Sequence, residues 1–277
     1  MTARLVPLLI ALAGVALPAL IQAKTRITLD GVEHEAFWSD GDSFRITQGP
    51  EKGLKSRIAQ FNTLESYGPV HRWGTWTREE LAGLAKKATN LVRSRDWECE
   101  TVKKDGEPIK DHYGRALIRC PGAAKALIEA GLAHVFFVDE GDADQELIEA
   151  QHAAQKAGAG MWAKGVPATI LTSVHSADEP NSDKPYNRVT DTITGLSRKI
   201  FHDKTYPRCT EACEGDSCLL YVPFNERYGK KRAECLLWGG ARPPIPTPVE
   251  QAPVPPAPRA PVETSPAPAQ GDADEVL

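Results

Sequence analysis

The feature that most constrains this chain is a series of short β-type segments near its start. Each segment is rich in β-branched or aromatic side chains, and turn residues separate one from the next. The dipeptides Asp30-Gly31 and Asp40-Gly41 are typical of tight hairpins. The pattern predicts a sheet built largely from consecutive strands, at Arg26–Leu29, Val32–Trp38, Ser43–Thr47 and Ser56–Phe61.

Helices are predicted to follow these strands. Thr77 and Glu80 have the spacing of a capping box, and apolar residues from Leu81 to Val92 then recur on one helical face. Further along, the pattern predicts a second hairpin, two more helices and one more strand, at Trp97–Lys103 with Arg115–Cys120, Ala123–Ala130 and Asp144–Ala157, and Leu132–Val138. This order predicts an α+β fold in which helices pack on a small closed barrel.

The first 23 residues have the features of an export signal. A lone arginine precedes the apolar run Leu5–Leu20, and Ala23 supplies a small residue for cleavage. The alternative is a retained membrane anchor, but the run is shorter than the roughly 20 residues that span a bilayer, and Pro7 and Pro18 interrupt it. We therefore expect a cleaved signal at 1–23, no membrane span after cleavage, and a periplasmic or secreted protein.

Composition divides the rest of the chain. Dense apolar periodicity marks a main domain over residues 24–165, and a polar stretch within residues 166–195 predicts a linker. Four cysteines lie close together in residues 196–240, which predicts a small disulfide-rich module. From residue 241 to residue 277 the chain is rich in Pro and Ala and ends in acidic residues, so we expect a disordered tail.

The chain has six cysteines, and an even number in an exported protein favours disulfides over free thiols. Cys99 and Cys120 lie on the two strands of the second predicted hairpin, where antiparallel pairing brings them opposite each other. We predict a bond between them, with two buried free thiols as the alternative. The other four are expected to pair among themselves, with a zinc site as the alternative; they are Cys209, Cys213, Cys218 and Cys235.

Candidate chemistry lies in three turns and one helix end. These are Asp40–Asp42, Arg57–Glu65, Asp111–Arg115 and the helix end that starts at Glu149. Carboxylate and carbonyl oxygens suit a hard cation such as calcium. Arginines suit a phosphate in its transition state, because each guanidinium donates a bidentate pair of hydrogen bonds. Arg57 and Asn62 are five residues apart, so a regular strand would direct them to opposite faces and a bend must bring them together.

The order and the amino-acid sequences of these motifs resemble those of the staphylococcal nuclease (thermonuclease) family. The chain carries DGDS, RIAQFNTLE, DHYGR, EAGLAHV and EAQ followed by GMW, in the family's order and with compatible spacings, over about residues 25 to 163. Each motif alone is commonplace, and the ordered set makes the resemblance specific. The resemblance implies a five-stranded OB-type β-barrel with three helices, and a calcium-dependent endonuclease or exonuclease that acts on DNA and RNA.

The resemblance also implies a metal site. The expected calcium ligands are Asp42, Asn62 and Thr63, the last through its backbone carbonyl. Asn62 departs from the family, which has an aspartate at this position, so the site loses one negative charge and we expect weaker calcium binding. Leu64 replaces a proline that stiffens the turn in the family.

The implied catalytic residues come from the same motifs. Arg57 and Arg115 fall on the two arginines that stabilise the five-coordinate phosphate. Glu65 falls on the glutamate that orients or activates the attacking water, and Tyr113 falls on a tyrosine near the nucleotide phosphate. The stretch Ala133–Val138 reads AHVFFV, where the family carries tyrosines that contact the nucleotide.

Two functions follow as alternatives: a nuclease, or an OB-type module that binds nucleic acid or another partner without cutting it. Asn62 motivates the second, whereas retention of Asp42, Glu65 and both arginines favours the first. The net charge of −4 means that nucleic-acid binding depends on a local basic cleft. A basic cluster at residues 227–232 is expected to be a solvated loop, with contact to a phosphate backbone as the alternative. We expect a monomer.

Overall fold

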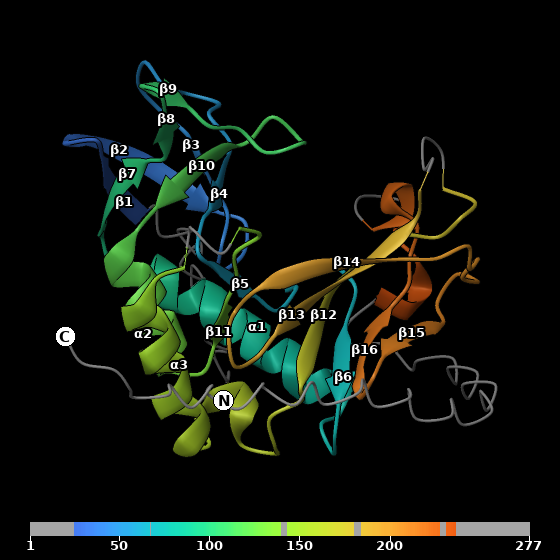
Figure 1. Ribbon diagram of the computed structural model, residues 1–277. Helices are drawn as coiled ribbons and strands as arrows, with labels where there is room; N and C mark the ends of the chain where they lie inside the picture. Colours follow the sequence, from blue (N-terminus) through green and yellow to red (C-terminus); the bar gives the residue numbers. More distant parts are fainter. Residues whose placement is uncertain (1–24, 67, 140–142, 180–183, 228–230, 237–277) are drawn as a thin grey trace, which may run out of the picture. The chain divides into compact units, whose positions relative to one another are not determined.

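The computed structural model describes residues 25–66, 68–139, 143–179, 184–227 and 231–236 (Figure 1). The predicted signal at residues 1–23 and the predicted tail at 241–277 lie outside these residues. Among the helices that the structure describes, none combines the length and the apolar character needed to cross a membrane.

Six short strands form one curled sheet in the order β3-β2-β1-β7-β10-β4. Their bounds are β1 Thr25–Leu29, β2 Val32–Trp38, β3 Phe44–Ile46, β4 Ser56–Ile58, β7 Trp97–Thr101 and β10 Ala116–Arg119. A bridge between Arg45 and Lys55 brings the edge strand β3 back toward β4, so the sheet nearly closes on itself. The predicted α+β fold with an OB-type barrel is confirmed, and the short strand β4 makes the sheet six-stranded.

Buried apolar side chains, which alternate along the strands, fill the inside of this barrel. Along β1, and along β2 from His34 onward, buried residues alternate with half-buried or exposed ones, as a period of two requires. Ile27, Trp38, Phe44, Ile58 and Ile118 are each at most 2% exposed and belong to one apolar cluster. Burial of side chains of this size contributes about 1.5–3 kcal/mol each, which makes the barrel interior the main source of its stability.

Three helices pack against the barrel, as predicted: α1 Arg78–Arg93, α2 Pro121–Glu129 and α3 Gln145–Lys156. The capping box is present, because the Glu80 backbone N–H donates to the Thr77 hydroxyl while the Glu80 carboxylate accepts from the Thr77 N–H. Gly131 follows α2 with φ of +62°, and a Cβ there would lie 2.1 Å from the Ala159 carbonyl oxygen. Only glycine permits this close contact between the end of α2 and the residues after α3.

The segment predicted as one strand, Ser56–Phe61, is broken in the structure. β4 ends at Ile58 and β5 begins at Phe61, with Gln60 between them at φ of +74°. β5 (Phe61–Thr63) leaves the barrel and pairs with β11 (Ala133–Val135). This break is the bend that the spacing of Arg57 and Asn62 requires.

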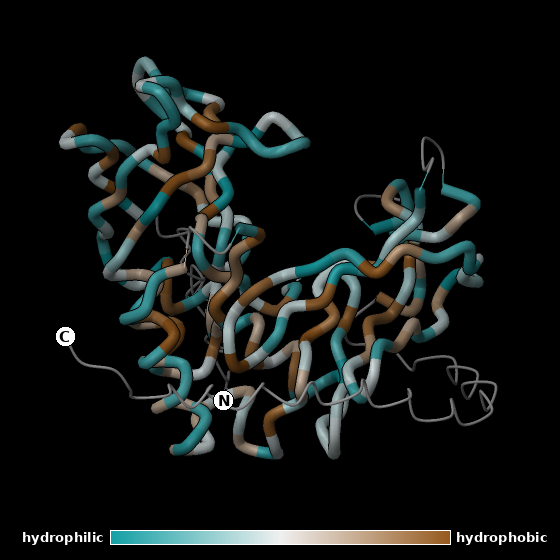
Figure 2. The backbone as a smooth tube through the Cα atoms, viewed as in Figure 1, coloured by the Kyte–Doolittle hydropathy of each residue, from teal (hydrophilic) through white to brown (hydrophobic). Residues whose placement is uncertain are grey.

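The second hairpin carries the predicted disulfide. Thr101 of β7 pairs with Ile118 of β10, and this antiparallel register places Cys99 opposite Cys120, with an S–S distance of 2.02 Å. The connection between the two strands contains the small hairpin β8 (Lys103–Lys104) and β9 (Glu107–Pro108). The loop from β9 to β10 is hydrophilic in Figure 2, in keeping with its exposed positions.

The predicted linker over residues 166–195 is wrong, because this stretch carries two strands. β12 (Thr169–Val174) and β13 (Tyr186–Asp191) form a sheet with β14 (Ser197–Phe201). Alternating apolar residues such as Leu171 and Val189 bury one face of this sheet, a signal that the polar stretch around them concealed. The cysteines of the C-terminal segment pair as Cys209–Cys235 and Cys213–Cys218.

The C-terminal segment, residues 169–236, packs directly on the barrel domain. Its hairpin of β15 (Glu211–Glu214) and β16 (Ser217–Leu220) adds to β6 (His71–Trp73) of the barrel domain to make one sheet. Three-residue 3-10 helices occur at η2 (Gly160–Trp162), η3 (Phe224–Glu226) and η5 (Glu234–Leu236).

Gln151, from the EAQ motif, joins the barrel domain to the C-terminal segment. Its side chain is fully buried, accepts from the Val135 N–H at 2.7 Å and donates to the Thr192 carbonyl at 2.7 Å. The β13–β14 turn lies against the end of β11, where the Phe137 N–H donates to the Gly195 carbonyl at 3.1 Å. The glutamine therefore satisfies one buried backbone group on β11 and one in the β13–β14 turn.

Candidate active site

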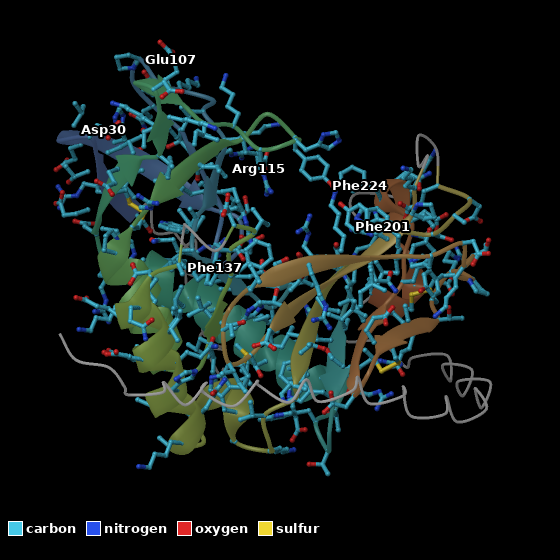
Figure 3. The ribbon with its side chains drawn as sticks, viewed as in Figure 1. Asp30, Glu107, Arg115, Phe137, Phe201 and Phe224 are labelled. Atoms are coloured by element: carbon cyan, nitrogen blue, oxygen red, sulfur yellow. A yellow bond between two sulfur atoms is a disulfide. The ribbon has the colours of Figure 1, made fainter. Side chains whose placement is uncertain are left out.

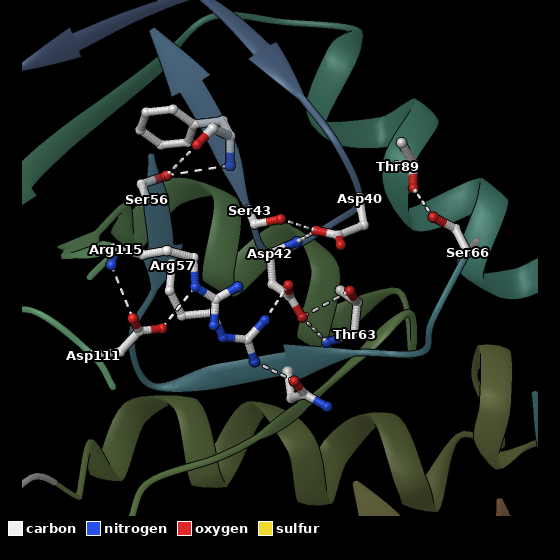
Figure 4. Close-up of polar contacts among 12 residues, drawn as sticks. Asp40, Asp42, Ser43, Ser56, Arg57, Thr63, Ser66, Thr89, Asp111 and Arg115 are labelled. Atoms are coloured by element: carbon white, nitrogen blue, oxygen red, sulfur yellow. Dashed lines mark hydrogen bonds and ion pairs between the residues drawn. The ribbon is translucent and has the colours of Figure 1, made fainter. Parts of the chain in front are cut away.

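The turn before β3 brings Asp42 against β5. One carboxylate oxygen of Asp42 accepts from the Thr63 N–H at 2.7 Å and from the Thr63 hydroxyl at 2.9 Å (Figure 4). Gly41 permits this approach, because a Cβ at that position would lie 2.6 Å from the Thr63 Cγ2 atom. The turn glycine therefore has a role in the site beyond reversing the chain.

Arg57 lies between two of the predicted metal ligands. Its guanidinium contacts the second carboxylate oxygen of Asp42 and donates to the side-chain oxygen of Asn62 (Figure 4). The break after β4 makes this possible, since it turns Asn62 back toward Arg57. Burial alone would raise the pKa of Asp42, but Arg57 and the Thr63 N–H outweigh it and hold that pKa below its usual value.

Asp40 adds a second carboxylate to the same turn. It accepts from the Ser43 hydroxyl at 2.6 Å and from the Asp42 N–H at 3.3 Å. Burial, and next the charges of Asp42 and Glu65, raise the pKa of Asp40 well above its usual value. The sequence offered Asp40 through the DGD turn, but only Asp42 was predicted as a site residue.

Glu65 follows β5 and is influenced by the negative charge of Asp42 and by the positive charges of three arginines. Burial and the Asp42 carboxylate raise the pKa of Glu65, whereas Arg57, Arg227 and Arg115 act to lower it. The net shift is upward. A carboxylate whose pKa moves toward neutrality is a better proton acceptor at neutral pH than an ordinary glutamate.

Arg115 is held in place by Asp111 of the same motif. Its Nε donates to the Asp111 carboxylate at 2.7 Å, and its backbone N–H donates to the other oxygen at 2.9 Å. The guanidinium also lies 5.6 Å from the ring centroid of Tyr113, which is 66% exposed. The DHYGR turn thus presents an arginine and an open aromatic ring together.

Some of the candidate site residues line one cavity of about 560 Å³. Asp40, Glu65 and Arg115 line it, as does Ser56 beside Arg57. The Asp42–Arg57–Asn62–Thr63 network borders the cavity without lining it, and Tyr113 is outside its lining. Two lining residues, Arg227 and Arg232, come from the C-terminal segment, where the sequence favoured a solvated loop.

His134 is a neighbour of the site that the sequence did not single out. It is 1% exposed on β11, opposite Asn62, and its Nε2 lies 3.4 Å from the Asn62 side-chain nitrogen. Burial lowers the pKa of His134 to about 4. A neutral imidazole next to Asn62 helps to fix the orientation of the amide, whose oxygen then faces Arg57.

Comparison with known proteins agrees with the motifs. Residues 55–164 match the family model described as staphylococcal nuclease homologue. The matched range includes Arg57, Glu65 and Arg115, and it begins after Asp42. A search of curated proteins finds no match to the chain. The barrel, the three helices and this match together show that residues 55–164 carry a domain of the staphylococcal nuclease type.

Proposed function

We propose that this protein is an exported calcium-dependent nuclease that hydrolyses phosphodiester bonds of DNA and RNA. The observation that carries the proposal is the grouping of a buried carboxylate, a half-buried amide, two arginines and a glutamate at and beside one cavity. Asp42 and Asn62 flank Arg57, while Glu65 and Arg115 line the cavity beside them.

A divalent cation fits the residues of this site. Asp40, Asp42 and Glu65 are mutually repelling carboxylates in a poorly solvated place, and two of them have raised pKa values for that reason. Such a cluster carries more negative charge than the Arg57 guanidinium neutralises. The donors are all oxygen atoms, which suits calcium. We infer that Asp42 and Asn62 would hold the ion through the oxygens that Arg57 contacts, with the Thr63 carbonyl as the third ligand.

We assign each residue of the site one role in the hydrolysis. When bound, calcium would supply Lewis-acid polarisation of a phosphoryl oxygen. Glu65 accepts a proton from the attacking water, helped by its raised pKa. Arg57 and Arg115 donate hydrogen bonds to the phosphoryl oxygens as negative charge develops. Tyr113 lies beside Arg115, and we expect its exposed ring to contact the nucleotide.

The alternative is a module that binds nucleic acid without cutting it. Asn62 is the residue that favours it, because an amide ligand contributes no charge to the cation site. Glu65 weighs against it, since a glutamate with a raised pKa beside two arginines has no evident use in binding a polyanion. We therefore place hydrolysis first.

A cleavage assay separates the two functions. Purified protein is incubated with fluorescently labelled single-stranded DNA and RNA, with a chelator, with calcium restored, or with magnesium. We expect cleavage only when calcium is present, and none from Glu65→Gln, which controls for a contaminating nuclease. Tight binding without cleavage under all of these conditions would select the alternative.

Export is supported by the cysteine pairing and the leader. All six cysteines form disulfides, which persist in oxidising compartments. Together with the apolar leader at residues 1–23, this supports a periplasmic or secreted protein. Fractionation of the producing cell, with mass measurement of the mature N-terminus, tests export directly.

A further inference from the structure

The C-terminal segment contributes positive charge to the candidate active site. The cavity that holds Glu65 is lined by five basic residues, which are Arg45, Lys55, Arg115, Arg227 and Arg232. Arg227 and Arg232 lie beyond residue 164, where the family match ends. A protein with a net charge of −4 has therefore gathered basic side chains at one cleft.

Arg227 is fixed in place but is not neutralised locally. Its Nε donates to the Val222 carbonyl at 2.8 Å, which anchors the side chain to the backbone. In the part of the chain that the structure describes, Arg208 pairs with Glu226 and Arg72 pairs with Glu211, whereas no carboxylate lies within ion-pairing distance of Arg227. Arg227 and Glu65 line the same cavity, so the Arg227 guanidinium lies on the wall of the candidate site.

An exposed aromatic ring accompanies Arg227. The guanidinium lies 5.9 Å from the ring centroid of Phe224, which is 65% exposed on η3 (Figure 3). The same arrangement occurs at the family motif, where Arg115 lies 5.6 Å from the exposed ring of Tyr113. The cavity is thus lined by the arginines of two arginine–aromatic pairs, one from each part of the chain.

We propose that Phe224 and Arg227 form a second nucleotide subsite, which binds single-stranded nucleic acid next to the scissile phosphate. Arginine binds a backbone phosphate, and an exposed ring stacks on an unpaired base, as in proteins that bind single strands. Bases of a duplex are already stacked and cannot use the ring. The C-terminal segment is then part of the substrate site and favours single-stranded over double-stranded substrate.

This inference rests on the proposed function for its substrate, but its test does not need catalysis. Binding of a fluorescent 12-nucleotide single strand and of a hairpin duplex is measured by anisotropy, in chelator and at several salt concentrations. Arg227→Gln is expected to weaken single-strand binding about tenfold and to reduce the slope of log K against log salt by about 0.7, the value of one phosphate contact. Arg227→Lys keeps the charge and is expected to retain most of the slope.

Phe224→Ala is expected to weaken single-strand binding about tenfold and to leave duplex binding and the salt slope unchanged, because stacking is not ionic. Lys204→Gln and Ile193→Ala are matched controls, since both residues are exposed in the same segment and neither lines the cavity. Thermal unfolding of each variant shows that it is folded.

The outcomes separate this inference from the proposed function. Unchanged single-strand affinity and slope in Arg227→Gln, or equal losses in the controls, would overturn the subsite, whether or not the protein cleaves. Selective losses in a protein that cleaves nothing would support the subsite and reject the nuclease. In a protein that cleaves, the subsite also requires a raised KM for single strands in both variants.

Discussion

Different partners hold the side chains of Arg57 and Arg115 at the candidate site. Arg57 is held by Asp42 and Asn62, and Arg115 is held by Asp111 of its own turn. Both groups act on the charge of Glu65. At the residue scale, the proposed reaction therefore depends on two guanidinium groups that carboxylate and amide side chains hold in place.

Replacing either arginine should slow the reaction far more than it weakens substrate binding. We expect Arg57→Ala and Arg115→Ala each to lower kcat by about 10²–10³, the usual effect of removing one transition-state donor. Arg57→Ala also leaves the buried Asp42 charge unpaired, so Arg57→Lys is made in parallel and stability is measured for each. Arg26→Ala, which removes an exposed arginine from β1, is the control. Near-normal kcat in either variant would contradict the assigned role.

Among the side chains proposed as calcium ligands, Asn62 is the one that we expect to limit the metal affinity, because it carries no charge. We expect Asn62→Asp to lower the calcium concentration at half-maximal cleavage by about tenfold, since it adds a charged ligand to an oxygen site. Asn90→Asp adds the same charge on the exposed face of α1 and serves as the control. An unchanged or higher half-saturating concentration in Asn62→Asp means that this side chain does not face the ion.

His71 on β6 makes stability depend on pH. It is 2% exposed, and burial lowers its pKa to about 3. The unfolded chain, with a histidine pKa of about 6.5, then binds a proton that the folded chain does not, so the free energy of unfolding falls as the pH drops below about 6.5. The loss attributable to His71 is about 2 kcal/mol at pH 5.

Urea unfolding at pH 5 and pH 7.5 tests this assignment. His71→Leu removes the titrating group while keeping an apolar side chain, so the difference between the two pH values should shrink by about 2 kcal/mol. His152→Leu, on the exposed face of α3, should leave the difference unchanged. Identical pH dependence in the wild type and His71→Leu would contradict a neutral buried histidine.

At the scale of elements, the DGD turn and β5 must approach each other closely. A Cβ at Gly41 would overlap the Thr63 methyl group, and the Thr63 hydroxyl is tied to Asp42. The neighbour therefore cannot move without breaking the contact that positions the predicted metal ligand. Packing between a turn and a strand, rather than either alone, creates the site.

Gly41→Ala is expected to displace the turn, to destabilise the fold by about 1–3 kcal/mol and to lower calcium-dependent cleavage more than it lowers stability. Gly83→Ala, in α1 where a Cβ meets nothing within 4 Å, is the matched control and should stabilise slightly. Calcium titration of cleavage, alongside urea unfolding, measures both effects. Wild-type calcium dependence in Gly41→Ala would show that the close contact is not needed.

At the scale of the whole molecule, one carboxylate joins the C-terminal segment to the barrel domain. Glu211 on β15 pairs with Arg72 of β6 at 2.8 Å and with Arg78 of α1 at 2.5 Å, and its side chain is 4% exposed. The pairing of β16 with β6 extends the same connection through the backbone. The two parts should therefore unfold in one cooperative transition.

We expect Glu211→Gln to lower the free energy of unfolding by about 3 kcal/mol, because it leaves two arginines without their buried carboxylate. Glu226→Gln breaks a more exposed pair with Arg208 and should cost less than about 1 kcal/mol. Tryptophan fluorescence and far-UV circular dichroism during urea unfolding measure both. Two separate transitions in the wild type would mean that the segments fold independently.

The sequence by itself determined the local elements and the family. Turn dipeptides, the Thr77 capping box and the terminal glycines act through neighbouring residues, so the helices and most strands lie where the pattern predicts them. The Cys99–Cys120 bond also followed, because both residues lie on one hairpin whose register is local. The ordered motifs identified the staphylococcal nuclease domain for the same reason, since each motif is a short continuous segment.

Tertiary structure alone decided how these segments meet. The bend at Gln60, a residue with positive φ that is not glycine, has no local signal, yet it brings Asn62 to Arg57. The strands within the predicted linker form because their apolar face is covered by distant residues of the C-terminal hairpin. Arg227 joins the cavity for a similar reason, because contacts between residues more than a hundred positions apart depend on packing that no short segment encodes.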